Sequence, residues 1–514
     1  MTAVWGTVAS AADGAAAPDS VEVATRDGVL AGERGAVLAF RGIPFAAPPV
    51  GPLRWKPPQP VAGWSGVRPA IAFGPDAMQH TRRRPVSEDC LYLNVWTPTL
   101  QPSRPLPVMV WIHGGGFTDG AGSVPMFDGA GFAGRGVVLV TINYRLGLFG
   151  FLAHPGLTQE SPDRVSGNYG LQDQIAALRW VQDNIARFGG DPDCVTVFGQ
   201  SAGAYSVSLL LTSPWAEGLF HRAILQSPGS LRPLPTLAEA EQAGAALECD
   251  VERLRAMTAG EILELQARLM AAQEPALLQP RPLGPVHDGR IVPWPDEGVA
   301  ATHGRLRAVD TVIGTCADEG VGFVKGWAID DQKAYGEFLR RQFGPRVREV
   351  FAHYPVRRDR EVKVALAAFH GDLHYLHGTR VMARALAGGE AQVFRYHFVR
   401  HWQGGEAAPT HGDEIAYVFG HLAQESQGPQ GFAGDKTRDD ELSEAMQAAW
   451  VRFATTGNPN GGGLPHWPSV GAEGDLYLEI GDAVRAAAGL RAEKVAFCGG
   501  LRRWRGPELS DASP

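Results

Sequence analysis

The sequence predicts an α/β fold in which a large, mostly parallel, twisted β-sheet carries helices on both faces. Three observations lead to this fold class. Short, continuously apolar segments recur along the chain, and segments with a helical apolar period separate them. The 514 residues are 44% hydrophobic and 20% charged, a composition typical of a globular protein with a large core.

Seven segments are predicted as strands. Several of them are continuously apolar rather than alternating, as is typical of strands that are buried on both faces of a parallel sheet. The segments are residues 91–96, 108–112, 137–143, 195–198, 223–226, 311–314 and 393–398.

The intervening segments show helical periodicity and recognisable helix ends. In residues 170–190, apolar side chains recur on one face until Gly189, Gly190 and Pro192 stop the helix. Thr258 and Glu261 have the spacing of a capping box ahead of another apolar stripe. A third stripe is expected to pack in the core; its residues are Leu442, Met446, Trp450 and Phe453.

The domain organisation predicted is one domain over residues 1–514. No Pro/Ser-rich linker, charge block or internal repeat divides the chain. Residues 231–310 and 320–390 lie between predicted strands and are mostly helical in pattern. We expect these two segments to be lid-like insertions over the sheet.

Charge gives no reason to expect binding to nucleic acid. Lys and Arg number 47 against 55 Asp and Glu, a net charge of −8. The one basic run, Arg82–Arg84, is expected to be a solvated loop, with an anion or partner site as the alternative.

The cysteines and the N-terminal segment predict a cytoplasmic protein. Five widely spread cysteines without a CxxC or Cys/His cluster favour neither a disulfide framework nor a zinc site. No Lys or Arg precedes Arg26, so no secretory signal is expected. The uncharged stretch 194–216 could span a bilayer, but a buried strand followed by a buried helix explains its glycines and serines better.

The sharpest chemical signal is the G-x-S-x-G at residues 199–203, which follows an apolar strand and opens a helix-like run. A nucleophile elbow needs such a strand-to-helix turn, with its serine in a strained conformation. The flanking glycines let strand and helix approach closely. We therefore predict Ser201 as a nucleophile, against the alternative of a plain Gly/Ser turn.

A glycine loop directly follows the strand at 108–112, in the sequence HGGGF. Backbone N–H groups on such a loop can stabilise the negative charge that develops on a carbonyl oxygen during acyl transfer. We assign the N–H groups of Gly115, Gly116 and Ala202 to an oxyanion hole. His113 is expected to be a structural hydrogen-bonding residue.

For the base and the acid, the residues alone leave alternatives open. Among 15 histidines, His411 lies in a loop after the last predicted strand, and His397 and His401 are rivals. The acid should follow the strand at 311–314, where Asp318 and Glu319 are both candidates.

The chain resembles the type-B carboxylesterases, the cholinesterase-like branch of the α/β-hydrolases, over nearly its whole length. The matching segments occur in the family's order, at residues 41–55, 87–98, 110–117, 143–151, 167–192, 197–204, 222–229, 318–320, 411–420 and 450–460. This resemblance implies the α/β-hydrolase fold and a catalytic triad of Ser201, Glu319 and His411. It also implies that Ser227 supports the acid and the histidine.

Three departures from the family pattern are informative. Cys90 lacks the partner that secreted members have, because Ala77 stands there, and Cys249 likewise lacks one. Gln200 replaces the glutamate that many members place before the nucleophile. The segment 77–90 carries no aromatic residue for cation–π contact with a quaternary ammonium group, so a choline ester is a poor candidate substrate.

The resemblance implies hydrolysis of carboxylic esters through an acyl-enzyme, on small-molecule substrates and without a cofactor or metal. We expect small neutral or apolar esters, with aryl or short acyl groups. The same machinery could act on amides, carbamates or thioesters. A binding protein on the same fold is the remote alternative. The sequence does not define the oligomeric state.

Overall fold

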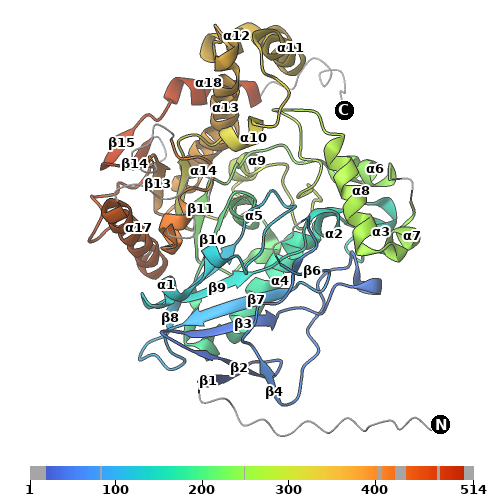
Figure 1. Ribbon diagram of the computed structural model, residues 1–514, viewed down its shortest axis with the longest axis vertical. Helices are drawn as coiled ribbons and strands as arrows, with labels where there is room; N and C mark the ends of the chain where they lie inside the picture. The colour runs from blue at the N-terminus through green and yellow to red at the C-terminus, as the bar shows by residue number, and fades with distance from the viewer. Residues whose placement is uncertain are drawn as a thin grey trace, which may run out of the picture.

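The computed structural model describes residues 19–80, 84–247, 249–401, 408–422, 436–471 and 475–502. It confirms the α/β prediction: a large mixed sheet crosses the molecule with helices on both sides (Figure 1). The strands are β1 (Ser20–Ala24), β2 (Val29–Arg34), β3 (Leu38–Pro44), β4 (Val67–Pro69), β5 (Asp76–Ala77), β6 (Val86–Ser87), β7 (Tyr92–Thr97), β8 (Leu106–Ile112), β9 (Val138–Ile142), β10 (Gly190–Gln200), β11 (Arg222–Gln226), β12 (Asp310–Cys316), β13 (Val393–Phe398), β14 (Leu476–Ile480) and β15 (Val484–Ala488).

The centre of the sheet is parallel and its margins are antiparallel. In spatial order β9, β8, β10, β11, β12, β13 and β14 run parallel. β7 joins β9 in antiparallel register, and β15 closes the other edge against β14. All seven predicted strands are present, as β7 to β13. The remaining strands, β1 to β6, β14 and β15, were not predicted.

Helices cover both faces. They are α1 (Ala130–Ala133), α2 (Gly147–Phe151), α3 (Pro155–Glu160), α4 (Tyr169–Asn184), α5 (Ala202–Leu210), α6 (Leu237–Ala245), α7 (Val251–Ala256), α8 (Ala259–Ala271), α9 (Glu297–Thr302), α10 (Val321–Val324), α11 (Gln332–Phe343), α12 (Val347–His353), α13 (Val362–Gly371), α14 (His377–Ala387), α15 (Ile415–Phe419), α17 (Lys436–Thr456) and α18 (Ala492–Arg502). The predicted capping box at the start of α8 is present, with Glu261 Oε2 accepting from Thr258 N at 2.7 Å.

The core lies in two layers on either side of the sheet. Val110 and Val197 point into the layer covered by α4 and α5. Trp111 and Phe198, the next residues along the same strands, point into the layer covered by α17. Because both faces are covered, successive residues of a central strand are all apolar.

Two helical regions connect the strands of the second half of the sheet, and of their helices α14 packs into the first core layer through Met382, Ala383 and Leu386. Residues 231–310 contain α6 to α9, and residues 320–390 contain α10 to α14, joined by a π-helix at Asp372–Leu376. Figure 1 shows α11, α12, α13 and α18 gathered at one end of the molecule, and α6, α7 and α8 along one side. Their role as a lid stays a prediction.

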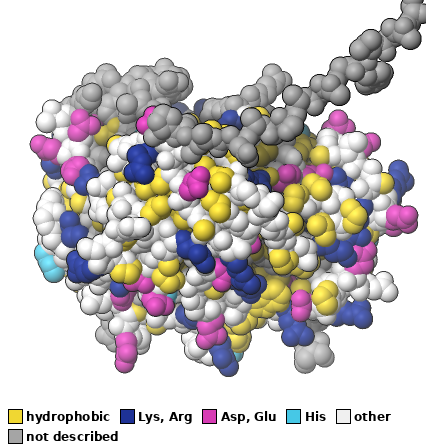
Figure 2. Space-filling model, turned by 90° about the horizontal axis from the view of Figure 1, so that it is seen from below, with side chains coloured by type: hydrophobic (Ala, Val, Ile, Leu, Met, Phe, Trp, Pro, Cys, Tyr) yellow, Lys and Arg dark blue, Asp and Glu magenta, His cyan; other side chains and the backbone are white. Residues whose placement is uncertain are grey.

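The described surface offers no single-sign charged face in the view of Figure 2, where basic and acidic side chains are interspersed. Of the predicted basic run, Arg82 and Arg83 lie outside the described residues. Arg84 is not a free solvated charge, because it pairs with Asp76 at 3.0 Å. No described helix has the length and apolarity to cross a bilayer.

Candidate active site

The strand-to-helix turn at Ser201 has the geometry that the G-x-S-x-G pattern predicts. Ser201 follows β10, opens α5 and has φ 56° and ψ −124°, an unusual conformation for a residue with a side chain. A Cβ on Gly203 would lie 2.0 Å from the carbonyl oxygen of Ile112 on β8. Only glycine therefore lets α5 pass so close to the neighbouring strand. Ser201 keeps 9% of its surface exposed.

The glycine loop after β8 lies beside this turn. A Cβ on Gly114 would meet the Cβ of Ser201 at 3.0 Å. Gly115 and Gly116 have φ of 104° and 64°, values that favour glycine. Within the described residues, neither of their N–H groups donates a hydrogen bond. Ala202 is the first residue of α5, where an N–H has no partner inside the helix.

His113 forms structural contacts at the start of the glycine loop, in agreement with the role expected of it. Its Nδ1 contacts the Gly114 carbonyl oxygen at 2.8 Å, and its ring stacks on Tyr144 with centroids 4.5 Å apart. Burial lowers the pKa of His113 to about 4. The ring is therefore neutral at pH 7 and braces the start of the glycine loop.

A glutamate and a histidine meet at the same edge of the sheet. Glu319 Oε2 lies 2.5 Å from His411 Nδ1. The other oxygen, Oε1, accepts from the Ser227 hydroxyl at 2.6 Å and from the Cys316 backbone N–H at 2.7 Å. Glu319 is 1% exposed. These contacts fix the carboxylate so that one oxygen faces the imidazole.

The rival candidates lie elsewhere. Asp318 forms an isolated bridge with Thr410 and donates its N–H to the Pro409 carbonyl at 2.9 Å, so it holds the loop that carries His411. His397 lies within β13 and contacts Thr315 Oγ1 at 3.0 Å. His401 follows that strand, and among the described residues it forms no hydrogen bond with this cluster.

The common position of these groups follows from the topology. The glycine loop, Ser201, Ser227 and Glu319 follow the carboxyl ends of β8, β10, β11 and β12, which are neighbours in the sheet. The loop after β13 brings His411 to them. Carboxyl ends of parallel strands share one edge, which is where α/β proteins place their sites.

Gln200 contacts the histidine directly. Its Nε2 lies 3.1 Å from His411 Nε2, the ring nitrogen that faces away from Glu319. The described hydrogen bonds do not include one between Ser201 Oγ and His411. Hydrogen bonds between catalytic groups are often long or misaligned in ligand-free enzymes and tighten when substrate binds.

Residues that sequence reasoning missed complete the surroundings. Glu414 is fully buried, with its carboxylate contacting Cys316 Sγ at 3.0 Å and Gln226 Nε2 at 3.2 Å. Burial, with a smaller effect from the charge of Glu319, raises the pKa of Glu414. A lone glutamate three residues after His411 was its only sequence signal.

Aromatic side chains from the helical region pack on the histidine. The rings of Phe323 and Tyr375 have centroids 5.0 Å and 4.7 Å from that of His411. Tyr375 comes from the π-helix, an irregularity often found at functional sites. No sequence pattern pointed to either residue, because hydrophobic periodicity does not define how their segments pack.

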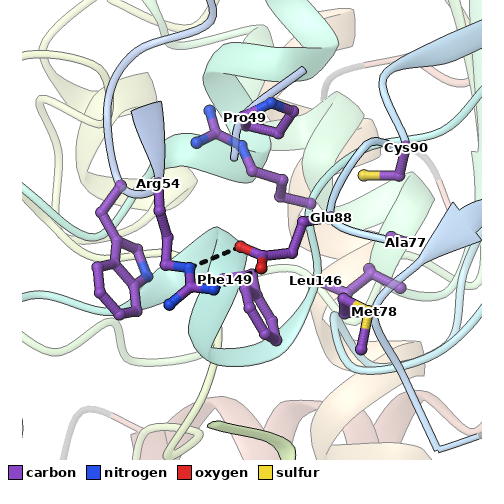
Figure 3. Close-up of a pocket in the computed structure, with 10 residues that line it drawn as sticks. Pro49, Arg54, Ala77, Met78, Glu88, Cys90, Leu146 and Phe149 are labelled. Carbon is purple, nitrogen blue, oxygen red and sulfur yellow. Dashed lines mark hydrogen bonds and ion pairs between the residues drawn. The ribbon is translucent and has the colours of Figure 1, made fainter. Parts of the chain in front are cut away.

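Cys90 and Ala77, the pair at which the chain departs from the family pattern, line one small cavity. Figure 3 shows Ala77 and Cys90 lining this cavity together with the ion pair of Arg54 and Glu88. Cys90 is buried, and all five cysteines are free. Among the described residues, no group of three or more His, Cys, Asp or Glu side chains is arranged to bind a metal ion.

The sheet order, the strained serine turn and the Glu319–His411 pair at the carboxyl edge define an α/β-hydrolase. The solved structures agree. A PNB esterase superimposes with a TM-score of 0.81 at 34% identity, covering 92% of this chain and 99% of that one. A thermophilic PNB esterase gives 0.82 at 34% identity, covering 93% and 99%.

The sequence comparisons give the family. The carboxylesterase family model matches residues 19–498, and the chain belongs to that family. The fumonisin B1 esterase of Sphingopyxis macrogoltabida is 43% identical over 92% of this chain and 89% of its own. Carboxylesterase 1D of Mus musculus is 35% identical over 91% of this chain and 89% of its own length. The chain is a serine carboxylic ester hydrolase.

Proposed function

We propose that the chain hydrolyses carboxylic esters with a triad of Ser201, His411 and Glu319. The observation that carries this proposal is the contact of Glu319 with His411 Nδ1 at the sheet edge where the strained Ser201 turn lies. Because Nδ1 faces the carboxylate, Nε2 is the nitrogen left to take the serine proton. Glu319 then stabilises the imidazolium.

The N–H groups of Gly115, Gly116 and Ala202 are the proposed oxyanion hole. Within the described part of the chain these N–H groups have no hydrogen-bond partner, and the glycine loop lies beside Ser201; both observations support this role. One such donor lowers the barrier by about 2.7–4 kcal/mol, because it meets the carbonyl oxygen as negative charge develops there.

The reaction then proceeds in two halves. The Ser201 hydroxyl oxygen bonds to the acyl carbon, and its proton passes to His411. The bond to the alcohol oxygen breaks as His411 returns that proton to the leaving alcohol. A water molecule deprotonated by His411 next attacks the acyl-enzyme and releases the carboxylic acid and free Ser201. Ser227 and Gln200 position the acid and the histidine.

The class of ester that the chain hydrolyses is a separate question. The sequence prediction of a small neutral or apolar ester stays a prediction, as does action on amides, carbamates or thioesters. One relative is named for fumonisin B1 and two structural neighbours for PNB esters, which supports an ester substrate of low molecular mass. The filled triad positions argue against a non-catalytic binding role.

Covalent labelling and substitution test the triad. A fluorophosphonate probe should label Ser201, as located by peptide mass spectrometry. Ser201→Ala and Glu319→Gln should lower kcat by at least about 10³-fold on 4-nitrophenyl acetate. Asp318→Asn is the matched control for the acid and should retain activity. Labelling at another residue, or loss of activity in the Asp318 variant alone, would contradict the assignment.

The organisation and location of the protein remain predictions. We propose one domain with residues 231–310 and 320–390 as lid-like insertions, and a cytoplasmic location. Cell fractionation of the source organism with an antibody to the chain tests the location.

A further inference from the structure

Two arginines lie beside the proposed active site without an acidic partner. Arg232 precedes α6, and Arg281 lies between α8 and α9. Within the described residues, neither forms an ion pair, whereas the buried arginines Arg54, Arg145, Arg395 and Arg400 do. A guanidinium held away from bulk water costs free energy unless its charge is compensated.

Arg281 lies against the proposed oxyanion loop. Its Nη1 donates to the Gly116 carbonyl oxygen at 3.4 Å, its only described hydrogen bond. A Cβ on Gly116 would meet the same Nη1 at 3.1 Å. Burial and the charge of Arg232 lower the pKa of Arg281 to about 10. Arg281 is therefore cationic at pH 7, and most of its donors are unused.

Arg232 approaches from the histidine side. Its Cζ lies 5.4 Å from the centroid of the Tyr375 ring, and that ring lies 4.7 Å from the ring of His411. Its Nη2 is buried and has no partner among the described residues. Arg281 therefore contacts the proposed oxyanion loop, and Arg232 packs on a ring that contacts the proposed catalytic histidine.

The other charged groups nearby do not neutralise them. Glu297 is fully buried, its Oε2 accepts from the Leu231 N–H at 2.9 Å, and burial raises its pKa. Asp296 caps α9 through the Val299 N–H at 2.8 Å. Burial, with the charges of nearby arginines, lowers the pKa of His370 and of His374 well below the usual range, so both rings are neutral.

Arg502 shows what an arginine with a structural role looks like in the same region. Its Nε and Nη2 donate to the Leu373 carbonyl oxygen at 3.2 Å and 2.8 Å, and its Nη1 donates to the Leu231 carbonyl oxygen. Backbone carbonyls thus use its donors. Arg232 and Arg281 lack such a set of partners, which leaves them available to a ligand.

We propose that Arg281 and Arg232 form a carboxylate-binding subsite beside the ester. The preferred substrates are then esters that carry a second, free carboxylate a few bonds from the scissile carbonyl, such as monoalkyl esters of dicarboxylic or tricarboxylic acids. This proposal rests on the proposed function, because it uses Gly116 to locate the ester. It departs from the sequence prediction of a neutral or apolar substrate.

The chemistry of arginine supports this class of substrate. The planar guanidinium group matches a carboxylate in shape and can donate two parallel hydrogen bonds to it. A charge-assisted hydrogen bond contributes enough to change an affinity by about 10- to 100-fold. A neutral ester would leave both cations uncompensated.

A matched pair of substrates tests the subsite. Monoethyl glutarate and ethyl pentanoate differ only by a carboxylate in place of a methyl group, and both release ethanol. For the wild-type chain, kcat/KM should be about 10-fold or more higher on monoethyl glutarate. Arg281→Met and Arg232→Met should each remove most of this preference by raising KM for monoethyl glutarate, so that the ratio of the two kcat/KM values falls toward one.

Two controls accompany the variants. Arg281→Lys should keep part of the preference, because it keeps the charge but loses the planar fork. Arg26→Met removes an exposed arginine that pairs with Asp183, and it should leave kcat/KM on both substrates unchanged. Glutarate itself should inhibit ethyl pentanoate hydrolysis competitively in the wild type and less in Arg281→Met.

The outcomes distinguish a failure of the carboxylate-binding subsite from a failure of the proposed triad. Equal or better turnover of ethyl pentanoate by the wild type would overturn the subsite, as would an equal loss on both substrates in Arg281→Met and Arg232→Met. If Ser201→Ala kept activity on both esters, the proposed triad itself would be wrong.

Discussion

The side-chain amide of Gln200 lies 3.1 Å from His411, on the ring nitrogen opposite the one that faces Glu319. In the proposed mechanism this nitrogen, Nε2, takes the proton of Ser201. Gln200 therefore occupies the hydrogen-bonding position that the serine hydroxyl must use. Before the serine proton is transferred, the Gln200 amide must release its hydrogen bond to Nε2 so that the serine hydroxyl can bond there.

Replacing this amide by a carboxylate should change the pH profile. In Gln200→Glu the new charge stabilises the imidazolium of His411, and an opposite charge this close shifts a pKa by roughly one unit or more. Because the base must be unprotonated, the acid limb of kcat/KM against pH moves to higher pH and activity at pH 7 falls. Hydrolysis of 4-nitrophenyl acetate between pH 5 and 9 measures this.

Gln200→Met is the matched control, since it removes the donor without adding charge and should leave the acid limb near that of the wild type. Identical limbs in all three proteins would show that residue 200 does not contact the imidazole in the free enzyme.

Gly203 should not tolerate even one methyl group. In Gly203→Ala the Cβ would lie 2.0 Å from the Ile112 carbonyl oxygen, so α5 must move away from β8. We expect a loss of about 1–3 kcal/mol in the free energy of unfolding. A displacement of this size can lower kcat by about 100-fold, because Ser201 precedes the helix.

Gly260→Ala is the control for this change. Gly260 lies in α8, and its nearest neighbour to a built Cβ is Thr258 Oγ1 at 4.0 Å. Chemical denaturation and steady-state kinetics should show that this variant is at least as stable and as active as the wild type. Equal kinetics for Gly203→Ala would show that the turn can relax.

Part of this architecture could be predicted because the physics is local. A strand buried on both faces must be apolar at every position, so the central strands show in the sequence. The turn at Ser201 also shows, because close backbone approach forces glycine at Gly199 and Gly203. The marginal strands β1, β2 and β15 are partly exposed and lack a continuous apolar run.

Other parts depend on contacts between distant segments. Asp318 and Glu319 are adjacent, and the carboxylate that turns toward His411 is determined by contacts with Ser227 and the Cys316 N–H, which are distant or unpredictable from the sequence. Arg232 and Arg281 come from segments without regular structure, so no periodicity relates them. Their proximity is a property of the folded chain alone.

The buried histidine in β13 predicts a loss of stability on acidification. His397 is 5% exposed, and burial lowers its pKa from 6.5 to about 4. Between these values the unfolded chain binds more protons than the folded one. The contribution of His397 to the free energy of unfolding is therefore complete above about pH 6.5. It falls by about 1.4 kcal/mol per pH unit as the pH drops toward 4.

His397→Gln removes this titration. Between pH 7 and pH 5 the variant should lose about 2 kcal/mol less unfolding free energy than the wild type, although it is less stable at pH 7. Urea denaturation followed by circular dichroism at both pH values measures the difference. Parallel losses in the two proteins would place the acid sensitivity in other groups.

The cavity shared by Ala77 and Cys90 predicts a site for a disulfide. Both residues line it (Figure 3), so a thiol introduced by Ala77→Cys should reach Cys90. A disulfide that closes a loop of roughly 15 residues raises the free energy of unfolding by about 3 kcal/mol. Burial raises the pKa of Cys90 well above the usual range, so oxidation is best carried out during refolding, when the thiol is accessible.

Thiol titration in denaturant gives the result. The wild type has five thiols; the variant has one more when reduced, and oxidation should remove two of the six. Ala77→Ser controls for the added polar atom and should not gain stability under the same oxidising conditions. If all six thiols remained after oxidation, the side chains at positions 77 and 90 would point apart despite lining one cavity.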